Sequence, residues 1–455
     1  MARIKTRPLE RNLSLARLGL GAGGQIMAHS IANLFRGESA RSEANRDFYQ
    51  RQAQVLADEL GQLKGSVMKA GQMLSLYGQY FLPPEAVAVL SGLQDDTAPV
   101  EWAVVEPVLR RALGARRLAE LEIEQRPMAA ASLGQAHRAR RRRDGRELVV
   151  KIQYPGVADA IESDIRSLSR LLAMSRLAPR GLDLGPVYNE VREMLHREVD
   201  YESEAHFTRS FAEKLRDDPR FVVPEVIDDY STDQVLTTSF EPGISARDPQ
   251  VRIWSQARRN RLGTAFLDLF LTEFFGWGMV QTDPHFGNYR LRPGADGADR
   301  IVLLDFGATR TFGRGFVEQY GRIVQAALLR DRPGIYAASQ AIGLMRPGFP
   351  EPVLEAFARL CELIVEPFNA LKDPATPAAL RNARGAYRWG ESDLPLRVGR
   401  AAALNSLSVH FRVPPREIVF LHRRMAGVFI MLATLGAELD ARQTLLDALA
   451  GADPG

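Results

Sequence analysis

The stretch QTDPHFGN at residues 281–288, followed by LLDFG at residues 303–307, decides the fold of this chain. Apolar residues beside the two motifs predict short strands at 289–291 and 301–304, separated by a short hairpin. Each motif alone is also typical of turn-forming residues at a strand end. Their order along the chain favours a chemical interpretation, because phosphoryl transfer from a nucleotide needs such a set of groups.

The polar residues of the two motifs suit different tasks in this chemistry. Asp283 is expected to orient or deprotonate a hydroxyl group or a water molecule. Asn288 and Asp305 offer hard oxygen ligands for a magnesium ion that bridges the phosphates. Gly307 lets the chain turn sharply directly after the second metal ligand.

An upstream strand adds a basic group to this set. Residues 149–152, VVKI, place Lys151 on a predicted strand, where its ammonium group is expected to neutralise the phosphates of a nucleotide. A glutamate on a helix is needed to hold such a lysine in position. The sequence therefore predicts that Lys151, Asn288 and Asp305 converge on one pocket for Mg²⁺ and ATP or ADP.

A loop of small residues precedes that strand, at the place where kinases carry a glycine-rich loop over the phosphates. The sequence PMAAASLGQ at residues 127–135 has alanine where glycine is usual. The residues expected to bind the nucleotide are Ala129, Ala130, Ala131 and Ser132. Their β-carbons disfavour positive φ angles, so we expect a stiffer loop whose backbone amides still face phosphate. The alternative is a simple turn before a strand.

The pattern along the whole chain predicts an α+β, protein-kinase-like bilobal fold, with a small antiparallel-sheet lobe, a helical large lobe and an N-terminal helical extension. Strands are predicted at 121–125, 135–140, 147–153, 222–227 and 235–240, with a turn at Asp144-Gly145, and helices over 44–113, 158–215, 254–277 and beyond 304. The predicted segments are an N-terminal arm over 1–43, the helical extension over 44–115, an N-lobe with inserted helices over 116–241, and a helical C-lobe with the catalytic and metal-binding loops over 242–455.

The composition limits the class of protein. The chain has 455 residues, of which 45% are hydrophobic, so it can bury one large or two modest cores. A net charge of +4 gives no reason to expect nucleic acid as a partner. The single cysteine, Cys361, cannot form an intrachain disulfide, which favours a reducing, cytoplasmic location.

Membrane attachment is treated as an alternative location. No run approaches the ~20 apolar residues that span a bilayer, and residues 425–435 are interpreted as a buried core helix. A helix over 13–35 with one apolar side is compatible with peripheral attachment or with packing on the domain. The arginine-rich run at 138–143 is typical of a solvated surface, and an anionic lipid or acidic partner is the alternative reading.

The chain resembles the UbiB/AarF (ABC1-type) family of atypical protein-kinase-like proteins over about residues 50–310. The motifs that carry this resemblance are KAGQ at 69–72, the alanine loop, VKIQYPG at 150–156, EVD at 198–200, QTD at 281–283 and DFG at 305–307. The first motif, the alanine loop and the Glu-x-Asp pair are the specific ones, because few other kinase-like groups have them in this order.

The resemblance implies a regulatory role for the helical extension. Lys69 and Gln72 would fold over the active site and engage Glu198 and Asp200, which would obstruct a protein substrate. A solvated helix face is the alternative for Lys69. No Ala-Pro-Glu motif follows Gly307, so an ATPase or a restricted phosphotransferase is expected rather than an ordinary protein kinase.

The resemblance also assigns further nucleotide-binding residues. Glu204 is the expected helix partner of Lys151, and Glu202 is its rival. The two glutamates lie about 200 degrees apart around a helix, so only one of them can face the lysine. Phe240 and Glu241 are expected at the hinge, where backbone groups would bind the adenine ring.

The function implied by the resemblance is ATP binding and hydrolysis in support of ubiquinone or other isoprenoid-lipid metabolism. The implied partners are an adenine nucleotide, an isoprenoid lipid or anionic membrane surface, and quinone-biosynthesis proteins. Two alternatives are a small-molecule phosphotransferase of the aminoglycoside or choline type and a nucleotide-switched lipid-binding scaffold. The motif KAGQ and the alanine loop argue against the first alternative.

Overall fold

The computed structural model describes residues 50–51, 53–54, 69–71, 73–74, 82, 84–91, 99–175, 184–406 and 415–452. The predicted N-terminal arm over 1–43, its helix over 13–35, and Gln72 lie outside the described residues. The described chain forms two compact units: residues up to Ser203 together with 226–240, and residues 204–225 together with those from Glu241 onward. The limits of the four predicted segments remain predictions.

The first unit contains an antiparallel sheet in the order β1-β3-β4-β6, with β2 also paired to β3. Its strands are β1 (Leu121–Ile123), β2 (Ala129–Ala130), β3 (Gly134–Arg141), β4 (Glu147–Gln153) and β6 (Val235–Ser239). In β4, Leu148, Val150 and Ile152 are buried, as the period-2 pattern requires for one face of a sheet. Gly145 has a φ of 71° in the turn between β3 and β4, which confirms the predicted turn.

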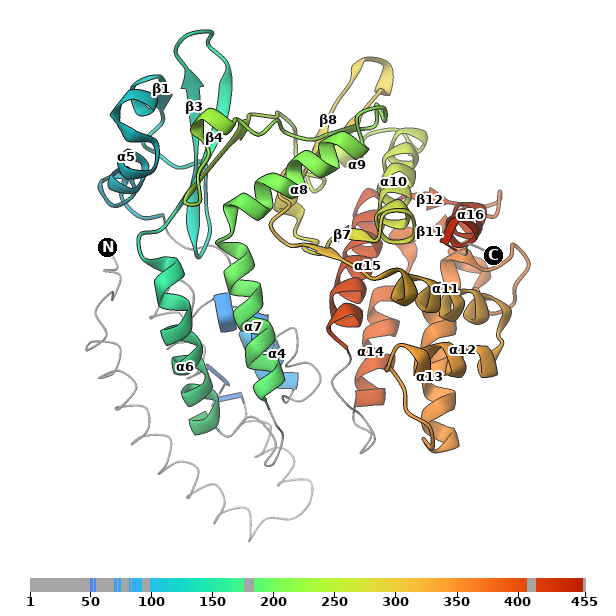
Figure 1. Cartoon of the computed structure of the whole chain (residues 1–455). Helices are drawn as coiled ribbons and strands as arrows, with labels where there is room; N and C mark the ends of the chain where they lie inside the picture. The colour runs from blue at the N-terminus through green and yellow to red at the C-terminus, as the bar shows by residue number, and fades with distance from the viewer. Residues whose placement is uncertain are drawn as a thin grey trace. The chain divides into compact units, whose positions relative to one another are not determined.

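Helices complete the first unit (Figure 1). They include α4 (Pro84–Ser91), α5 (Trp102–Ala119), α6 (Val157–Ser175) and α7 (Gly185–Glu198), and α8 (Tyr201–Lys214) begins here and continues into the second unit. Figure 1 shows α6 and α7 side by side, in agreement with their packing contacts.

The second unit is mainly helical, and its described residues also form three small sheets. Its helices are α9 (Pro249–Arg252), α10 (Gln256–Leu271), α11 (Arg314–Leu329), α12 (Arg332–Ala341), α13 (Glu351–Ile364), α14 (Leu394–Ser406), α15 (Arg416–Leu435) and α16 (Arg442–Ala452). The sheets pair β7 (Met279–Gln281) with β10 (Thr309–Thr311), β11 (Tyr387–Arg388) with β12 (Glu438–Leu439), and β9 (Arg300–Leu303) with both β5 (Phe221–Val222) and β8 (Tyr289–Arg292). The strands β10, β11 and β12 correct the expectation that everything after residue 304 is helical.

Two other predicted elements differ from the structure. The strand expected over 222–227 is reduced to β5 and an isolated bridge at Val226, because Pro224 lies between them and has no backbone N–H to donate. The helix expected over 254–277 is α-helical only to Leu271. A π-helical turn over Thr272–Gly276 follows it and places Glu273 in the interior.

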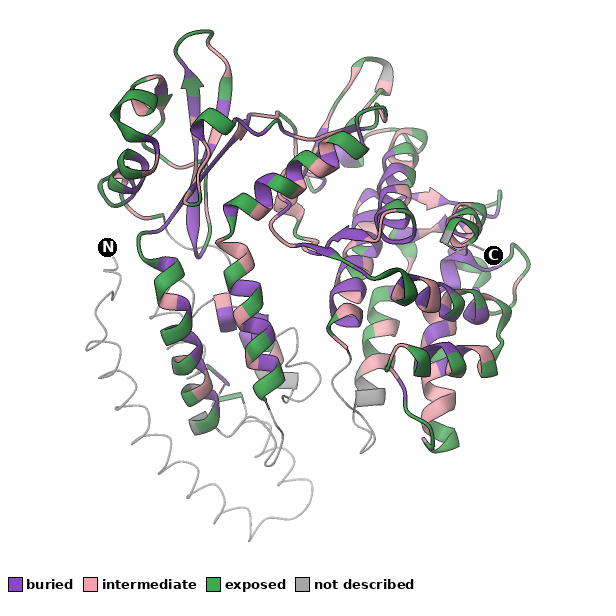
Figure 2. Ribbon diagram, viewed as in Figure 1, coloured by how far each residue is buried: buried purple, intermediate pink, exposed green. Residues whose placement is uncertain are grey.

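The core of the second unit is built largely on α10 and α15, whose buried residues are purple in Figure 2. Among the described helices, α15 alone is long and apolar enough to cross a membrane, with a mean hydropathy of 1.6 over 18 residues. This corrects the expectation that no such run exists. However, 61% of that window is buried inside the protein, as the predicted core helix requires, and its middle carries the fully buried Arg424.

Candidate active site

Two strand pairings position the predicted catalytic and metal-binding loops in the second unit. In the β8–β9 hairpin, Tyr289 faces Leu303, and the N–H of Leu304 donates to the carbonyl of Asn288 at 2.9 Å. In the β7–β10 pair, Gln281 faces Thr309. The first pairing joins Asn288 to the strand that leads into Asp305. The second joins the strand before Asp283 to the segment that follows the DFG motif.

The carboxylate of Asp283 is held at both of its oxygens. The Asn288 amide nitrogen donates to Oδ2 at 2.8 Å, and Nη2 of Arg423 donates to Oδ1 at 2.7 Å. The Arg423 pair is about one-quarter to one-third exposed, with values of 30% for Arg423 and 26% for Asp283. The structure therefore brings Asp283 and Asn288 into direct contact, and it adds an arginine from α15 that the sequence did not indicate.

The donor set of the second unit fits a hard cation such as magnesium. The Asn288 amide nitrogen must face the Asp283 carboxylate because it is the donor, and this fixes the side-chain oxygen of Asn288 on the other side. Asp305 accepts a hydrogen bond from the N–H of Gly307 at 3.0 Å, which closes a tight turn at the DFG motif. An amide oxygen and a carboxylate on adjoining loops are ligands of the type that Mg²⁺ prefers.

A buried polar network lies behind these loops. The fully buried Arg424 pairs with Glu273 at 3.2 Å and donates to the Tyr289 hydroxyl at 2.6 Å. That hydroxyl donates to Oε1 of Gln281 at 3.2 Å, and the Gln281 amide nitrogen donates to the carbonyl of Asp305 at 3.3 Å. Burial raises the pKa of Tyr289, so the phenol stays protonated and remains a donor. The network thus links the π-helical turn and α15 to both loops.

Burial also raises the pKa of the Glu273 carboxyl, and the Arg424 charge opposes this effect. The Arg424 guanidinium group therefore favours the ionised form of the buried Glu273 carboxyl group. The ion pair is a structural feature with a cost for the loss of either member.

His422 precedes the two arginines on α15, and it predicts a pH-dependent stability. Its Nε2 lies 3.0 Å from the Tyr320 hydroxyl, and burial lowers its pKa from 6.5 to about 4. Between these pH values the unfolded state binds a proton that the folded state refuses. The contribution of the neutral His422 to the free energy of unfolding is therefore expected to be fully present above pH 6.5. This contribution should fall by about 3 kcal/mol as the pH drops to 4.

Urea denaturation of wild type and His422→Gln at pH 7 and pH 5 measures this effect. The difference between the two proteins isolates His422 from the other titrating groups. An equal loss of stability in both proteins on going to pH 5 would contradict the assignment.

The predicted nucleotide-binding residues of the first unit lie around β4. Lys151 is paired in register with Ala136 and Leu236, and its Nζ lies 5.8 Å from the centre of the Tyr201 ring. In the alanine loop, Ala129 and Ala130 form β2, and the N–H of Ala131 donates to the carbonyl of Gly134 at 2.8 Å. The loop is therefore a folded turn joined to the sheet.

Two residues of this loop are constrained or unsatisfied. A β-carbon on Gly134 would lie 2.6 Å from the Ile152 carbonyl oxygen and 2.9 Å from the Tyr201 hydroxyl, so only glycine fits. Ser132 is completely buried, and its hydroxyl has no hydrogen-bond partner in the part of the chain that the structure describes. An unsatisfied buried hydroxyl is costly, and a bound ligand is one way to satisfy it.

The predicted regulatory residues show two kinds of contact. Lys69 forms an ion pair with Glu198 at 3.1 Å. Asp200 instead accepts from the N–H of Ser203 at 2.9 Å, at the beginning of α8. The partner expected for these residues from the same motif, Gln72, lies outside the described residues.

The two rival glutamates of α8 differ in burial. Glu202 is exposed, whereas Glu204 is 5% exposed. A β-carbon on Gly307 would lie 3.4 Å from Glu204 Oε2 and 3.5 Å from Asp305 Oδ1, so Glu204 lies beside the DFG turn. The pairing of Glu204 with Lys151 stays a prediction.

The two hinge residues have separate partners. The N–H of Phe240 donates to the carbonyl of Glu147 at 3.1 Å, and Glu241 forms an ion pair with Arg292. The predicted role of the Phe240 and Glu241 backbone groups in adenine binding stays a prediction.

Comparison with known families identifies residues 92–339 as an ABC1 atypical kinase-like domain, which covers more than half of the chain. The chain belongs to the ABC1 family. This confirms the sequence-based resemblance and the assignment to a class of kinase-like enzymes.

Relatives within the ABC1 family align along most of the chain. The protein named "Atypical kinase COQ8, mitochondrial" from Schizosaccharomyces pombe is 32% identical over 395 residues, which are 87% of this chain and 62% of that protein. The protein of the same name from Saccharomyces cerevisiae is 31% identical over 444 residues, which are 96% of this chain and 83% of that protein. COQ8B from Rattus norvegicus is 31% identical over 98% of this chain and 81% of that protein.

A solved structure supports the fold of this ABC1 chain. Rv3197 from Mycobacterium tuberculosis, determined in complex with erythromycin, superposes with a TM-score of 0.57 at 25% identity. The match covers 89% of this chain and 97% of that protein. Together with the family assignment, it confirms the predicted α+β, kinase-like fold.

Sequence reasoning missed the part of this site that α15 supplies. Arg423 and Arg424 follow His422 within an apolar helix, and this interruption was the only signal available. Gly427 lies one turn later and has no such signal in the sequence. Their partners lie far away along the chain, so no local sequence pattern reveals these contacts.

Proposed function

We propose that this protein binds a magnesium adenine nucleotide and hydrolyses ATP or transfers its terminal phosphoryl group to a restricted acceptor. The observation that carries the proposal is the arrangement of Asp283, Asn288 and Asp305 on two paired loops of one unit. Magnesium, when bound, neutralises charge on the phosphates. Asn288 and Asp305 would hold it, and Asp283 would orient the attacking hydroxyl or water by accepting its hydrogen bond.

The remaining predicted residues receive roles in nucleotide binding. Lys151 would neutralise phosphate charge, with Glu204 as its partner, and backbone groups of Phe240 and Glu241 would bind adenine. The buried, unsatisfied hydroxyl of Ser132 supports a phosphate-binding role for the loop formed by Ala129, Ala130, Ala131 and Ser132. The ion pair of Lys69 with Glu198 supports a regulatory role for the helical extension.

The proposed location is cytoplasmic, with peripheral attachment to a membrane as the alternative. The proposed cellular role is support of ubiquinone or another isoprenoid-lipid pathway. Support comes from the relatives named COQ8, which are described as mitochondrial, and the chain spans 62% of the first of them. Isoprenoid lipids, anionic membranes and quinone-biosynthesis proteins are proposed partners. Ubiquinone that stays absent when this chain replaces COQ8 in S. cerevisiae would count against this role.

Nucleotide binding is expected to depend on the metal. Titration calorimetry with ADP and ATP should give at least about tenfold weaker binding in EDTA than in Mg²⁺, because the phosphates then meet Asp305 without a bridging cation. Equal affinities with and without Mg²⁺, or no binding at all, would refute the proposal.

The small-molecule phosphotransferase alternative needs a separate measurement. Hydrolysis by the proposed enzyme is expected to change little when small alcohols such as choline or aminoglycosides are added. Rapid ATP-dependent phosphorylation of one of these alcohols would favour the alternative.

A further inference from the structure

One face of α15 packs against the loop that carries Asp283. Arg423 and Gly427 are one helical turn apart and therefore lie on the same side of the helix. Arg423 pairs with Asp283, and a β-carbon on Gly427 would lie only 2.0 Å from the β-carbon of Pro284. An arginine thus holds the aspartate, and the absence of a side chain at Gly427 lets the next residue pack against the helix backbone.

The same helix face continues on both sides of this contact. Phe420, one turn before Arg423, lies under the guanidinium group of Arg310 at 3.4 Å from its ring centre, and Arg310 belongs to β10. Arg424 fixes Tyr289, the first residue of β8. The helix therefore contacts β10, which pairs with the strand before Asp283, and β8, which follows the Asp283 loop.

The two hydrogen bonds to Asp283 fix its carboxylate group. Arg423 occupies Oδ1 and the Asn288 amide occupies Oδ2, so the carboxylate cannot rotate without losing one of them. Asn288 is itself a proposed magnesium ligand. Loss of Arg423 would free one end of the carboxylate and leave the Asn288 amide with a mobile acceptor.

We propose that Arg423 is a positioning residue for phosphoryl transfer, acting through Asp283, and that Gly427 provides the space this loop needs. The inference rests on the proposed function above. Arg423 orients Asp283 toward the acceptor and, through Asp283, orients Asn288. Correct orientation of such groups accounts for a large part of the rate in transfer reactions, because small displacements are costly.

The Arg423–Asp283 contact is separable from folding. Both side chains are partly exposed, and ion pairs of this kind contribute little to stability. Arg424, the next residue, is completely buried, so its contacts are expected to stabilise the fold. A loss of turnover without a loss of stability is therefore expected for Arg423 and not for Arg424.

The first experiment measures ATP hydrolysis and nucleotide affinity in Arg423→Gln. The turnover number is expected to fall about tenfold or more, while the Kd for Mg-ADP stays within about twofold. Arg423→Lys keeps the charge and should recover part of the rate. The matched control is Arg359→Gln, which removes an exposed ion pair with Glu355 on α13 and should leave turnover unchanged.

A double-mutant cycle separates this positioning effect from a structural one. In an Asp283→Asn background, Arg423→Gln is expected to change the single-turnover rate with radiolabelled ATP less than about twofold, because its target is already altered. A further tenfold loss in that background would overturn the inference.

The Gly427 contact gives an independent test. Gly427→Ala is expected to lower turnover because the added methyl group displaces Pro284, and Pro284→Gly in the same chain should restore part of the rate. Gly399→Ala on α14 is the control, since a β-carbon there meets no atom within 4 Å. Unchanged turnover in both Gly427→Ala and Arg423→Gln, in a wild-type background that hydrolyses ATP, overturns this inference alone. A wild type without Mg²⁺-dependent hydrolysis overturns the proposed function as well.

Discussion

Asp305→Asn is expected to lower Mg²⁺-dependent ATP hydrolysis at least about 100-fold. The substitution keeps the shape of the side chain but removes the negative charge of a proposed metal ligand. Folding should be preserved, because the asparagine oxygen can still accept the hydrogen bond from the N–H of Gly307 that closes the turn. Hydrolysis is measured as phosphate release at saturating Mg-ATP, with thermal denaturation of the same samples.

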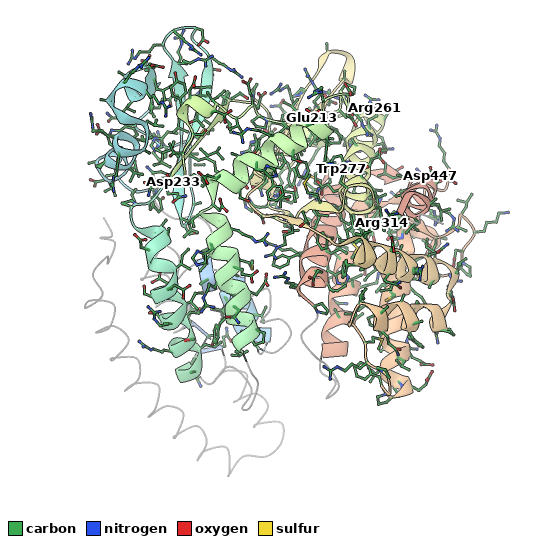
Figure 3. All side chains as sticks on the ribbon, in the orientation of Figure 1. Glu213, Asp233, Arg261, Trp277, Arg314 and Asp447 are labelled. Atoms are coloured by element: carbon green, nitrogen blue, oxygen red, sulfur yellow. The ribbon has the colours of Figure 1, made fainter. Side chains whose placement is uncertain are left out.

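The control for this substitution is Asp447→Asn. Asp447, labelled in Figure 3, is an exposed residue of α16 that accepts a hydrogen bond from Gln443, so its charge has no proposed part in the reaction. Rates that are equal and at background level in wild type and Asp305→Asn would instead support the nucleotide-switched scaffold. In that case nucleotide binding without turnover would be the function of the site.

Arg424→Met is expected to have the largest effect on stability. It leaves the buried Glu273 carboxyl group without its cationic partner, and removal of one member of a buried pair typically costs about 3–5 kcal/mol. Tyr289 also loses the donor to its hydroxyl. Chemical denaturation followed by tryptophan fluorescence measures the loss.

The double variant Arg424→Met with Glu273→Leu distinguishes the cause. If the unpaired charge is responsible, the second substitution should recover much of the lost stability, since apolar replacement of a whole buried pair is often tolerated. Arg359→Met, which breaks an exposed pair on α13, should cost less than about 1 kcal/mol. A single and a double variant of equal stability would show that packing, rather than charge, sets the effect.

Local patterns were sufficient to predict most of the sheet of the first unit. The alternation of apolar residues gave β4 at its observed limits, and Asp144-Gly145 marked the turn before it. The QTD and DFG motifs were equally readable, because the proposed phosphoryl transfer requires those residue types in a fixed order. In each case the information lies within a few neighbouring residues.

The contributions of α15 could not be predicted in this way. Helical periodicity indicates which side of a helix is buried but not what it is buried against. Arg423 and its partner Asp283 are 140 residues apart, and Arg424 and Glu273 are 151 apart. Two arginines inside an apolar helix were therefore interpretable only as an interruption, although they contact Asp283 and Tyr289.

The position of α15 along the chain has a consequence for protein engineering. The recognisable ABC1 domain ends at residue 339, whereas α15 begins at Arg416. A fragment that ends at residue 339 would keep the QTD and DFG motifs and lose both Arg423, which holds Asp283, and Arg424, which holds Tyr289. With the role proposed for Arg423, the shortest active segment is longer than the segment that can be recognised, and any excised version of the enzyme should extend at least through α15.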